Sequence, residues 1–340
     1  MKNILITGSE GYIGSIMVPF FIEKGFNVVG LDSSFFSEGN LNQTYLPRYK
    51  LIKKDIRKVE LIDLDGIDAI IHLAGLSNDP LGMLNEKLTY DINYHASVRL
   101  AELAKRSKID RFIFSSSCSL YGKGDGNALT EEGVQNPQTA YAKSKVLTEE
   151  ALVKMADKKF CPTYMRNATA YGISPRMRFD LVVNNLSGFA HATNEIRIMG
   201  DGTPWRPLVH IRDITQAFYL ALMADRNKVW NQAFNVGKSS ENYQIKSIAE
   251  IVKMRYPNCD IKIMQKNAGD NRDYNVSFSK IETVLGLTTN WTVPQGVDEA
   301  KACFDMIKLN KELFNNRNYT RLNQIQFLLE NKIINSELFI

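Results

Sequence analysis

Tyr141 and Lys145 are the two side chains of this sequence whose types and spacing most directly suggest chemistry. They stand four positions apart in the stretch Tyr-Ala-Lys-Ser-Lys, a spacing that places two side chains on one face of a helix. A free tyrosine titrates near ~10, and an ammonium beside the phenol favours the phenolate and lowers that pKa. A lowering of ~3 pKa units corresponds to ~4 kcal/mol, which requires further positive charge such as an oxidised nicotinamide. The same spacing is also common on solvated helix faces, so the rest of the chain must decide.

A glycine-rich turn near the start of the chain predicts a dinucleotide site. It follows the apolar run 2–7, which predicts a buried strand, and precedes a helical pattern at 16–22. In this context Gly8 permits a tight turn, Gly11 lets a pyrophosphate approach the backbone, and Gly14 allows close packing of the helix. The helix N-terminus then faces the anion. A glycine turn without a ligand is the alternative.

An acidic residue at the end of the second predicted strand favours NAD over NADP. That strand spans 27–31 and ends at Asp32, about 20 residues beyond the glycine turn. A carboxylate at this position accepts hydrogen bonds from the adenosine ribose and repels a 2′-phosphate. The next residues, Ser33, Ser34 and Phe35, include no arginine. A solvated aspartate at a strand end is the competing interpretation.

The elements that must position these residues alternate between strands and helices, which predicts an α/β fold with a doubly wound parallel sheet. Ligands of such sheets bind beyond the carboxyl ends of the strands. We expect an NAD-binding domain at 1–170, to which 207–238 returns, a smaller substrate lobe from 171–206 and 239–310, and a helical tail at 311–340. Further strands are predicted at 49–53, 68–75, 111–114, 159–166 and 231–236, and helices at 86–108, 139–155, 182–192, 245–255, 279–285 and 294–309, with another opening at 209–214.

Composition excludes several other classes of protein. The chain has 340 residues, of which 44% are hydrophobic and 23% charged, and a net charge of +5. This charge suits an anionic small molecule and is too small to indicate nucleic acid. The four cysteines are scattered without metal-ligand spacing, which predicts reduced thiols, no metal site and a cytoplasmic protein. No apolar run approaches the ~20 residues of a membrane span, and the tail at 311–340 is expected to pack on the protein.

Taken together, the glycine turn, Asp32, the serine-rich strand end at Ser117, the Tyr141/Lys145 pair and the stretch 166–172 resemble one family. The sequence is similar to the extended short-chain dehydrogenases/reductases, specifically the NAD-dependent nucleotide-sugar epimerases and dehydratases that include UDP-glucose 4-epimerase. The resemblance covers about residues 1–305. It implies a Rossmann-type fold, bound NAD and a nucleotide-sugar substrate, and a homodimer formed through helices near 89–107 and 139–156.

The resemblance also implies roles for individual residues. Ser117 and Tyr141 would contact the sugar 4-hydroxyl, and Lys145 would bind the nicotinamide ribose; Tyr141 then takes the proton while hydride passes from C4 to NAD. The implied NAD contacts are Gly8, Gly11, Tyr12, Ile13, Gly14, Asp32, Asp55, Ile56, Leu73, Ala74, Asn93, Ser115, Tyr141 and Lys145. The expected substrate contacts are Ser117, Thr169, Arg176, Arg178, Asn184, Asn185, Leu186, Arg206 and Arg272, with the arginines as candidate phosphate ligands and solvent exposure or structural ion pairs as their alternative.

Departures from the family pattern narrow the predicted chemistry. The 4,6-dehydratases place acids at the positions of Cys118 and Ser119, so the acid that eliminates water is missing here. Cys118 is then a packing residue. A phosphate-binding arginine of the family corresponds to Asn267, which leaves Arg272 as a substitute. The loop 174–178 resembles a subgroup of bacterial enzymes of surface-polysaccharide synthesis.

The predicted function is a nucleotide-sugar 4-epimerase or 4-dehydrogenase that holds NAD. One alternative is an NADPH-dependent 4-keto-sugar reductase, which Asp32 opposes. The other is a non-catalytic NAD-binding scaffold, which would have lost Ser117, Tyr141 or Lys145; all three are present.

Overall fold

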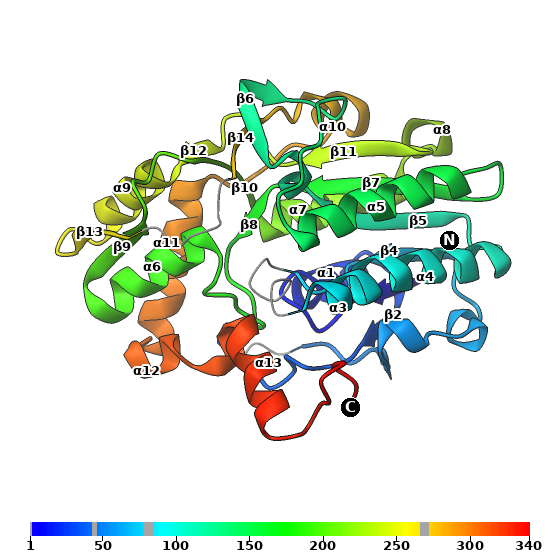
Figure 1. The fold of residues 1–340 in the computed structure, drawn as a ribbon, viewed down its shortest axis with the longest axis horizontal. Helices are drawn as coiled ribbons and strands as arrows, with labels where there is room; N and C mark the ends of the chain where they lie inside the picture. Colours follow the sequence, from blue (N-terminus) through cyan, green and yellow to red (C-terminus); the bar gives the residue numbers. More distant parts are fainter. Residues whose placement is uncertain (1, 43–45, 78–84, 266–271) are drawn as a thin grey trace.

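The core of the protein is a seven-stranded, fully parallel sheet, seen in a computed structural model that describes residues 2–42, 46–77, 85–265 and 272–340 (Figure 1). Its strand order is β11-β7-β5-β4-β1-β2-β3. The strands are β1 (Asn3–Thr7), β2 (Asn27–Asp32), β3 (Lys50–Lys53), β4 (Ala69–His72), β5 (Arg111–Ser117), β7 (Cys161–Asn167) and β11 (Gln232–Val236). The central strand β1 carries consecutive hydrophobic residues because both of its faces are covered; Ile4, Leu5 and Ile6 are fully buried. The predicted doubly wound fold is confirmed, and so is the late strand that returns to the sheet.

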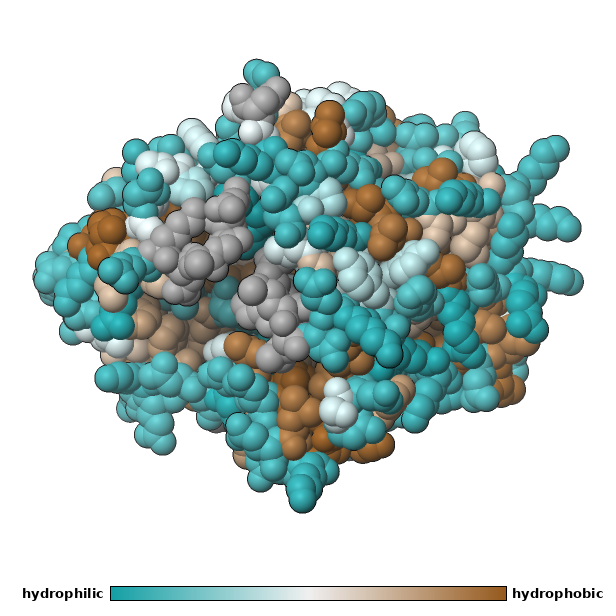
Figure 2. All heavy atoms as spheres, in the orientation of Figure 1, coloured by the Kyte–Doolittle hydropathy of each residue, from teal (hydrophilic) through white to brown (hydrophobic). Residues whose placement is uncertain are grey.

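Helices cover both faces of this sheet. On one face, α1 (Gly14–Glu23) and α7 (Ile211–Met223) pack together and share a core with α10 (Ser279–Leu285). On the other face lie α3 (Glu86–Tyr90), α4 (Ala96–Arg106) and α5 (Ala140–Met155). Hydrophilic residues cover most of the surface seen in Figure 2.

The long helix predicted at 86–108 contains a π-helical turn at Asp91–His95, between α3 and α4. A π turn is rare and leaves one carbonyl outside the regular hydrogen-bond ladder. Here the carbonyl of Asn93 accepts from the hydroxyls of Ser97, at 2.7 Å, and Thr148, at 3.2 Å. The turn therefore ties this helix to α5, which carries Tyr141 and Lys145.

A second group of elements forms the smaller lobe. It contains a three-stranded sheet of β12 (Asn242–Gln244), β10 (Trp205–His210) and β8 (Thr169–Tyr171), and the pairs β13 (Asp260–Met264) with β9 (Glu195–Met199) and β14 (Asp273–Val276) with β6 (Lys123–Leu129). Its helices are α6 (Val182–Thr193), α9 (Ile245–Arg255) and α11 (Val293–Ile307), while the short α8 (Arg226–Val229) precedes β11. Two expectations were wrong in detail. Residues 205–210 form a strand, so the helix expected to open at 209 begins at Ile211. The strand predicted from residue 159 begins at Cys161 because Asp157 and Phe160 close a tight turn.

The tail predicted at 311–340 is helical and packs against the main body. It contains α12 (Lys311–Phe314), a short 3₁₀ turn at Arg317–Tyr319 and α13 (Arg321–Glu330). Ile325, Leu328, Ile334 and Leu338 join the core on the α4 face of the sheet, and Figure 1 shows α13 and the C-terminus on the side of β2. Among the described residues, no helix is long and apolar enough to cross a membrane.

Candidate active site

The predicted functional residues gather along one edge of the main sheet. Because its strands are parallel, β1, β2, β4 and β5 all end at this edge, at Thr7, Asp32, His72 and Ser117. The glycine turn follows β1, and the N-terminal turn of α5 brings Tyr141 to the end of β5. This is the edge at which ligands of doubly wound sheets bind.

Lys145 is fixed in place at the end of β5. Its ammonium donates to the carbonyl of Ser115 at 2.7 Å and lies 5.6 Å from the centroid of the Tyr141 ring. Only 5% of Lys145 is exposed, and this burial lowers its pKa to about 8, while the carboxylate of Glu149 opposes the shift. At neutral pH the side chain is mostly charged, so the predicted pairing of an ammonium with the Tyr141 phenol is present in the fold.

Ser117 stands where β5 passes into a 3₁₀ turn at Cys118–Tyr121. It caps this turn, because its Oγ accepts from the backbone N–H of Ser119 at 3.1 Å. The hydroxyl proton is left to donate elsewhere, and both Ser117 and Tyr141 are half-buried. Ser117 therefore ends the strand whose Ser115 carbonyl holds Lys145, and Lys145 in turn lies beside the Tyr141 ring.

The turn after β1 fits the pyrophosphate of a dinucleotide. A Cβ on Gly14 would lie 2.2 Å from the carbonyl oxygen of Gly8, and one on Gly8 would lie 2.8 Å from the amide nitrogen of Ala74. These contacts leave space only for glycine. Ile13, which precedes α1, makes no side-chain cap, and the first turn of α1 has no acidic residue, so no side chain there competes with an anion for this helix N-terminus.

The remaining predicted cofactor residues surround this turn, but not all of them present a free side chain. Asp32 accepts from the N–H groups of Glu10, at 3.0 Å, and Ser34, at 2.8 Å. The phenol of Tyr12 is buried and bonded to the carbonyl of Gly172 and the amide of Asn184, so it joins the glycine turn to the smaller lobe. Asp55 and Ile56 follow the end of β3, and the Asp55 carboxylate accepts from Arg57. Leu73 and Ala74 follow the end of β4, and their N–H groups donate to Thr7.

Asn93 and Ser115 lie one layer behind the expected cofactor position. The Asn93 amide accepts from the N–H of Leu76 at 2.7 Å and donates to the Leu76 carbonyl at 3.0 Å. It thereby fixes the backbone that follows β4. Ser115 receives the Lys145 ammonium on its carbonyl and the Asn167 amide on its hydroxyl. Both residues position the site rather than line it.

The predicted substrate residues of α6 divide into buried supports and one half-buried side chain. The Asn184 carbonyl oxygen accepts from the N–H of Gly172 at 3.0 Å, and Leu186 belongs to the core of the smaller lobe. Asn185 is half-buried and donates to the carbonyl of Phe179 at 2.7 Å. The helix therefore holds the segment 172–180 in place through its asparagines.

Two of the four predicted phosphate arginines lie together in the smaller lobe. Arg206, on β10, donates to the carbonyl of Arg272 at 2.6 Å. Thr169 is half-buried on β8, the neighbour of β10 in the three-stranded sheet. The position of Asn267, named in the comparison with the family, lies outside the described residues.

Arg176 and Arg178 occupy a different place, against the elements expected to hold the cofactor. The Arg176 guanidinium lies 3.8 Å from the carboxylate of Glu10 in the glycine turn. Arg178 donates to the hydroxyl of Ser77, just beyond β4, at 3.1 Å and is paired with Asp180 at 2.7 Å. The prediction grouped them with Arg206, but the fold separates them because the segment 172–178 runs back across the end of α1.

A buried ionic cluster beneath Lys145 was missed in the sequence. Glu149, one turn after Lys145 on α5, pairs with Arg166 of β7 at 2.7 Å and accepts from the hydroxyl of Ser116. Arg166 also donates to the phenol of Tyr121 at 3.1 Å. The only local indication of this cluster in the sequence was the i, i+4, i+8 spacing of Tyr141, Lys145 and Glu149. The partners of Glu149 lie on other elements, so sequence spacing could not predict them.

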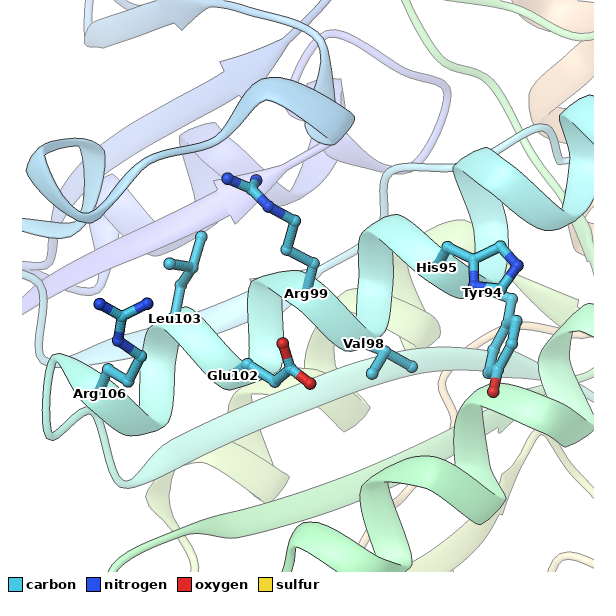
Figure 3. Close-up of a pocket in the computed structure, with 7 residues that line it drawn as sticks. All are labelled: Tyr94, His95, Val98, Arg99, Glu102, Leu103 and Arg106. Atoms are coloured by element: carbon cyan, nitrogen blue, oxygen red, sulfur yellow. The ribbon is translucent and has the colours of Figure 1, made fainter.

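Two further findings concern groups outside the site. All four cysteines are buried and free, and the described residues contain no cluster suited to a metal ion. Figure 3 shows a pocket along α4, lined by Tyr94, His95, Val98, Arg99, Glu102, Leu103 and Arg106.

Comparison with known proteins gives a consistent result. Residues 4–237 match the model of the NAD dependent epimerase/dehydratase family. A UDP-glucose 4-epimerase of Neisseria meningitidis serogroup C is 26% identical over 330 residues, which cover 88% of this chain and 96% of that protein. A putative UDP-glucose 4-epimerase of Methanocaldococcus jannaschii is 28% identical over 258 residues, or 74% of this chain and 81% of that protein.

Solved structures share the fold. The UDP-glucuronic acid 4-epimerase of Bacillus cereus superimposes with a TM-score of 0.79 and 24% identity, covering 90% of this chain and 99% of that one. The NAD-dependent NDP-hexosamine 5,6-dehydratase TunA gives a TM-score of 0.80 at 21% identity, covering 89% and 97%. At these identities the likeness establishes the architecture alone.

Proposed function

The chain belongs to the NAD dependent epimerase/dehydratase family, and from this premise we propose that it is a nucleotide-sugar 4-epimerase or 4-dehydrogenase. Family membership makes it an enzyme with NAD as its cofactor. The observation that carries the finer proposal is the buried Lys145 ammonium beside the Tyr141 ring, at the strand end that also presents Ser117.

In this proposal Tyr141 takes the proton of the sugar 4-hydroxyl. The fixed charge of Lys145 stabilises the phenolate, and Ser117 donates to the oxygen as it becomes a carbonyl. NAD, when bound, accepts the hydride from C4. The 4-keto sugar either takes hydride back on its other face, which inverts C4, or leaves as product.

The residues that follow β5, Cys118 and Ser119, favour a reaction limited to oxidation and reduction over one that also eliminates water. Cys118, where the dehydratases of the family place an acid, is buried and donates to the carbonyl of Arg166 at 3.1 Å. Burial raises the pKa of its thiol well above the usual range, so the thiol stays neutral and cannot serve as a base. The adjacent hydroxyl of Ser119 is not an acid at neutral pH.

Asp32 supports NAD over NADP, against the reductase alternative. Its carboxylate is held by two backbone N–H groups at the end of β2, where a 2′-phosphate would meet a fixed negative charge. Arg206 and its neighbour Arg272 are the proposed contacts for the nucleotide phosphates of the substrate. A role in surface-polysaccharide synthesis follows from the resemblance of the loop 174–178 and is part of the proposal.

We also propose that the protein forms a homodimer through α4 and α5. These helices pack side by side on one face of the sheet. Val98 lines the pocket along α4 (Figure 3), and Val153 of α5 is 46% exposed. A second pair of the same helices would cover both, and the mass in solution tests this.

Tyr141→Phe tests the catalytic proposal. The protein is incubated with UDP-, GDP-, dTDP- and CDP-sugars with and without added NAD, and inversion at C4 or a 4-keto product is followed by NMR. Because the variant lacks the proton acceptor, turnover should fall about a hundredfold or more while NAD binding is retained. Tyr219→Phe, on α7 at the opposite face of the sheet, is the matched control and should be fully active. Undiminished turnover by Tyr141→Phe would overturn the assignment.

A further inference from the structure

Arg321, the first residue of α13, is a buried cation with an unsatisfied donor. Only 2% of it is exposed. Its Nη2 donates to the carbonyl of Arg176 at 3.0 Å, and its guanidinium lies 4.2 Å from the centroid of the Phe36 ring. Its Nη1 has no hydrogen-bond partner among the described residues. Buried polar groups are paired with few exceptions, so an acceptor is missing from the surroundings of Arg321.

Arg321 lies in a cluster of three buried arginines with Arg176 and Arg178. Arg178 is neutralised by Asp180, whereas Arg176 donates to the carbonyl of Gly39, has only a longer ionic contact of 3.8 Å to Glu10, and keeps an Nε without a partner among the described residues. Burial and repulsion by Arg178 lower the pKa of Arg321 to about 9. Arg176 and Arg321 are therefore the two members with charge that the described residues do not fully balance.

This pair faces the part of the site where the dinucleotide is expected. Glu10 belongs to the glycine turn, and its own N–H donates to Asp32 at the end of β2. The two carboxylates lie close enough for Glu10 to raise the pKa of Asp32, after the larger effect of burial. A pyrophosphate beside these acids is repelled unless cations lie on its other side. Arg176 lies by Glu10 and Arg321 interacts electrostatically with Asp32, and each guanidinium retains an N–H with no acceptor among the described residues.

We propose that Arg321, supplied by the C-terminal segment 311–340, binds the pyrophosphate of NAD together with Arg176. A planar guanidinium with a free N–H matches a phosphate oxygen in geometry and charge. The inference rests on the NAD dependence of the family and not on the proposed chemistry at C4.

The same segment holds the chain that follows Asp32. Gln324 donates to the carbonyl of Phe35 at 2.9 Å, and Arg317 pairs with Glu38 at 2.9 Å. The N–H of Phe179 donates to the carbonyl of Tyr319 at 2.9 Å. The C-terminal segment thus packs against the chain that follows Asp32 and against the segment that carries Arg176 and Arg178.

Arg321→Met tests this role, with Arg317→Met as the matched control. Arg317 lies in the same segment and stacks on an aromatic ring, Phe327, at 3.6 Å, but its charge is paired with Glu38 on the half-exposed side. The dissociation constants of NAD and of adenosine are measured by calorimetry on nucleotide-free protein, and the NAD that remains after gel filtration is quantified. We expect Arg321→Met to weaken NAD binding about ten- to a hundredfold, the value of a charge-assisted hydrogen bond, with adenosine binding unchanged. Arg317→Met loses the pairing with Glu38 that helps to hold the segment, so it should change the affinities for NAD and for adenosine to the same extent.

Two results would overturn the proposal. One is wild-type NAD affinity in Arg321→Met, and the other is an equal loss of NAD and adenosine binding, which would make Arg321 a structural support only. If Arg321→Met does not fold, Arg321→Lys decides, because it keeps the charge without the planar fork: a selective loss of NAD binding is expected, and equal losses refute the role. These measurements need no turnover, so they stand apart from the result with Tyr141→Phe.

Discussion

Glu149→Gln removes one charge from the buried cluster of Glu149 and Arg166 beneath Lys145. In the native protein Arg166 makes three hydrogen bonds to the Glu149 carboxylate, at 2.7, 3.1 and 3.2 Å. Burial opposes the charge of Arg166, but Glu149 keeps the pKa of that guanidinium above its ordinary value. The glutamine amide turns a donor toward Arg166, so the variant contains a buried cation without its counter-ion.

Breaking a buried ion pair on one side costs about 3–5 kcal/mol. We expect the lower end, about 3 kcal/mol, because Arg166 retains the carbonyl of Glu131 at 2.8 Å and the phenol of Tyr121. For a chain of 340 residues the unfolding entropy of ~2.1 cal/mol/K per residue converts this cost to a fall in Tm of roughly 4 °C. Since Glu149 also raises the pKa of Lys145, the alkaline limb of the activity profile should move to lower pH.

Thermal and urea unfolding, with pH profiles of turnover, measure both effects. Glu150→Gln is the matched control, because the neighbouring Glu150 is exposed on the same helix and its loss should change stability by less than about 0.5 kcal/mol. The reasoning is refuted if Glu149→Gln costs no more than this control, or if its alkaline limb stays in place while stability falls.

Two further predictions concern acid stability and the glycine turn. Burial lowers the pKa of His72 to about 3, so between that pH and about 6.5 the unfolded chain binds a proton that the native protein does not. The stability conferred by the neutral ring is therefore fully present above pH ~6.5. Below that pH it is lost at about 1.4 kcal/mol per pH unit. The free energy of unfolding, measured in urea from pH 7 to 4, should show this slope. The slope should be smaller in His72→Asn and unchanged in the exposed control His95→Asn. In the glycine turn, a Cβ on Gly14 meets Gly8 oxygen at 2.2 Å but one on Gly11 meets it at 3.1 Å, so Gly14→Ala should lower Tm far more than Gly11→Ala. Both variants should lose NAD affinity by calorimetry, and full NAD binding by Gly11→Ala would contradict the assigned pyrophosphate position.

The order of elements was readable from the sequence because it depends on local patterns. Short apolar runs mark strands buried on both faces, and the predicted strands of the main sheet are present. The strand at Trp205–His210 was missed because Pro204 and Pro207 flank its start and obscure the pattern. The π turn at Asp91–His95 was also missed, since its helical periodicity differs from that of an α-helix by one residue in a single turn.

The candidate site was only partly predictable. Lys145 and Tyr141 were placed together because an i, i+4 spacing is a property of one helix. Arg176 and Arg206 were grouped because both are arginines in loop-like sequence, yet the fold places Arg176 by Glu10 and Arg206 by Arg272. The two arginines lie in different places because of the path that the chain takes between them, which the sequence pattern did not predict.

What the sequence by itself determined is therefore the local chemistry: the glycine turn, the acid at the end of β2, and the tyrosine–lysine pair on α5. Each of these depends on a few neighbouring residues and on the geometry of one element. The tertiary structure decided which distant residues complete them, Arg166 beneath Lys145 and Arg321 beside Asp32. Those pairings come from the packing of strands and helices that are far apart in the chain. Burial there strengthens the electrostatic interactions of an unbalanced charge, and the periodicity of the sequence does not predict which residues will be partners.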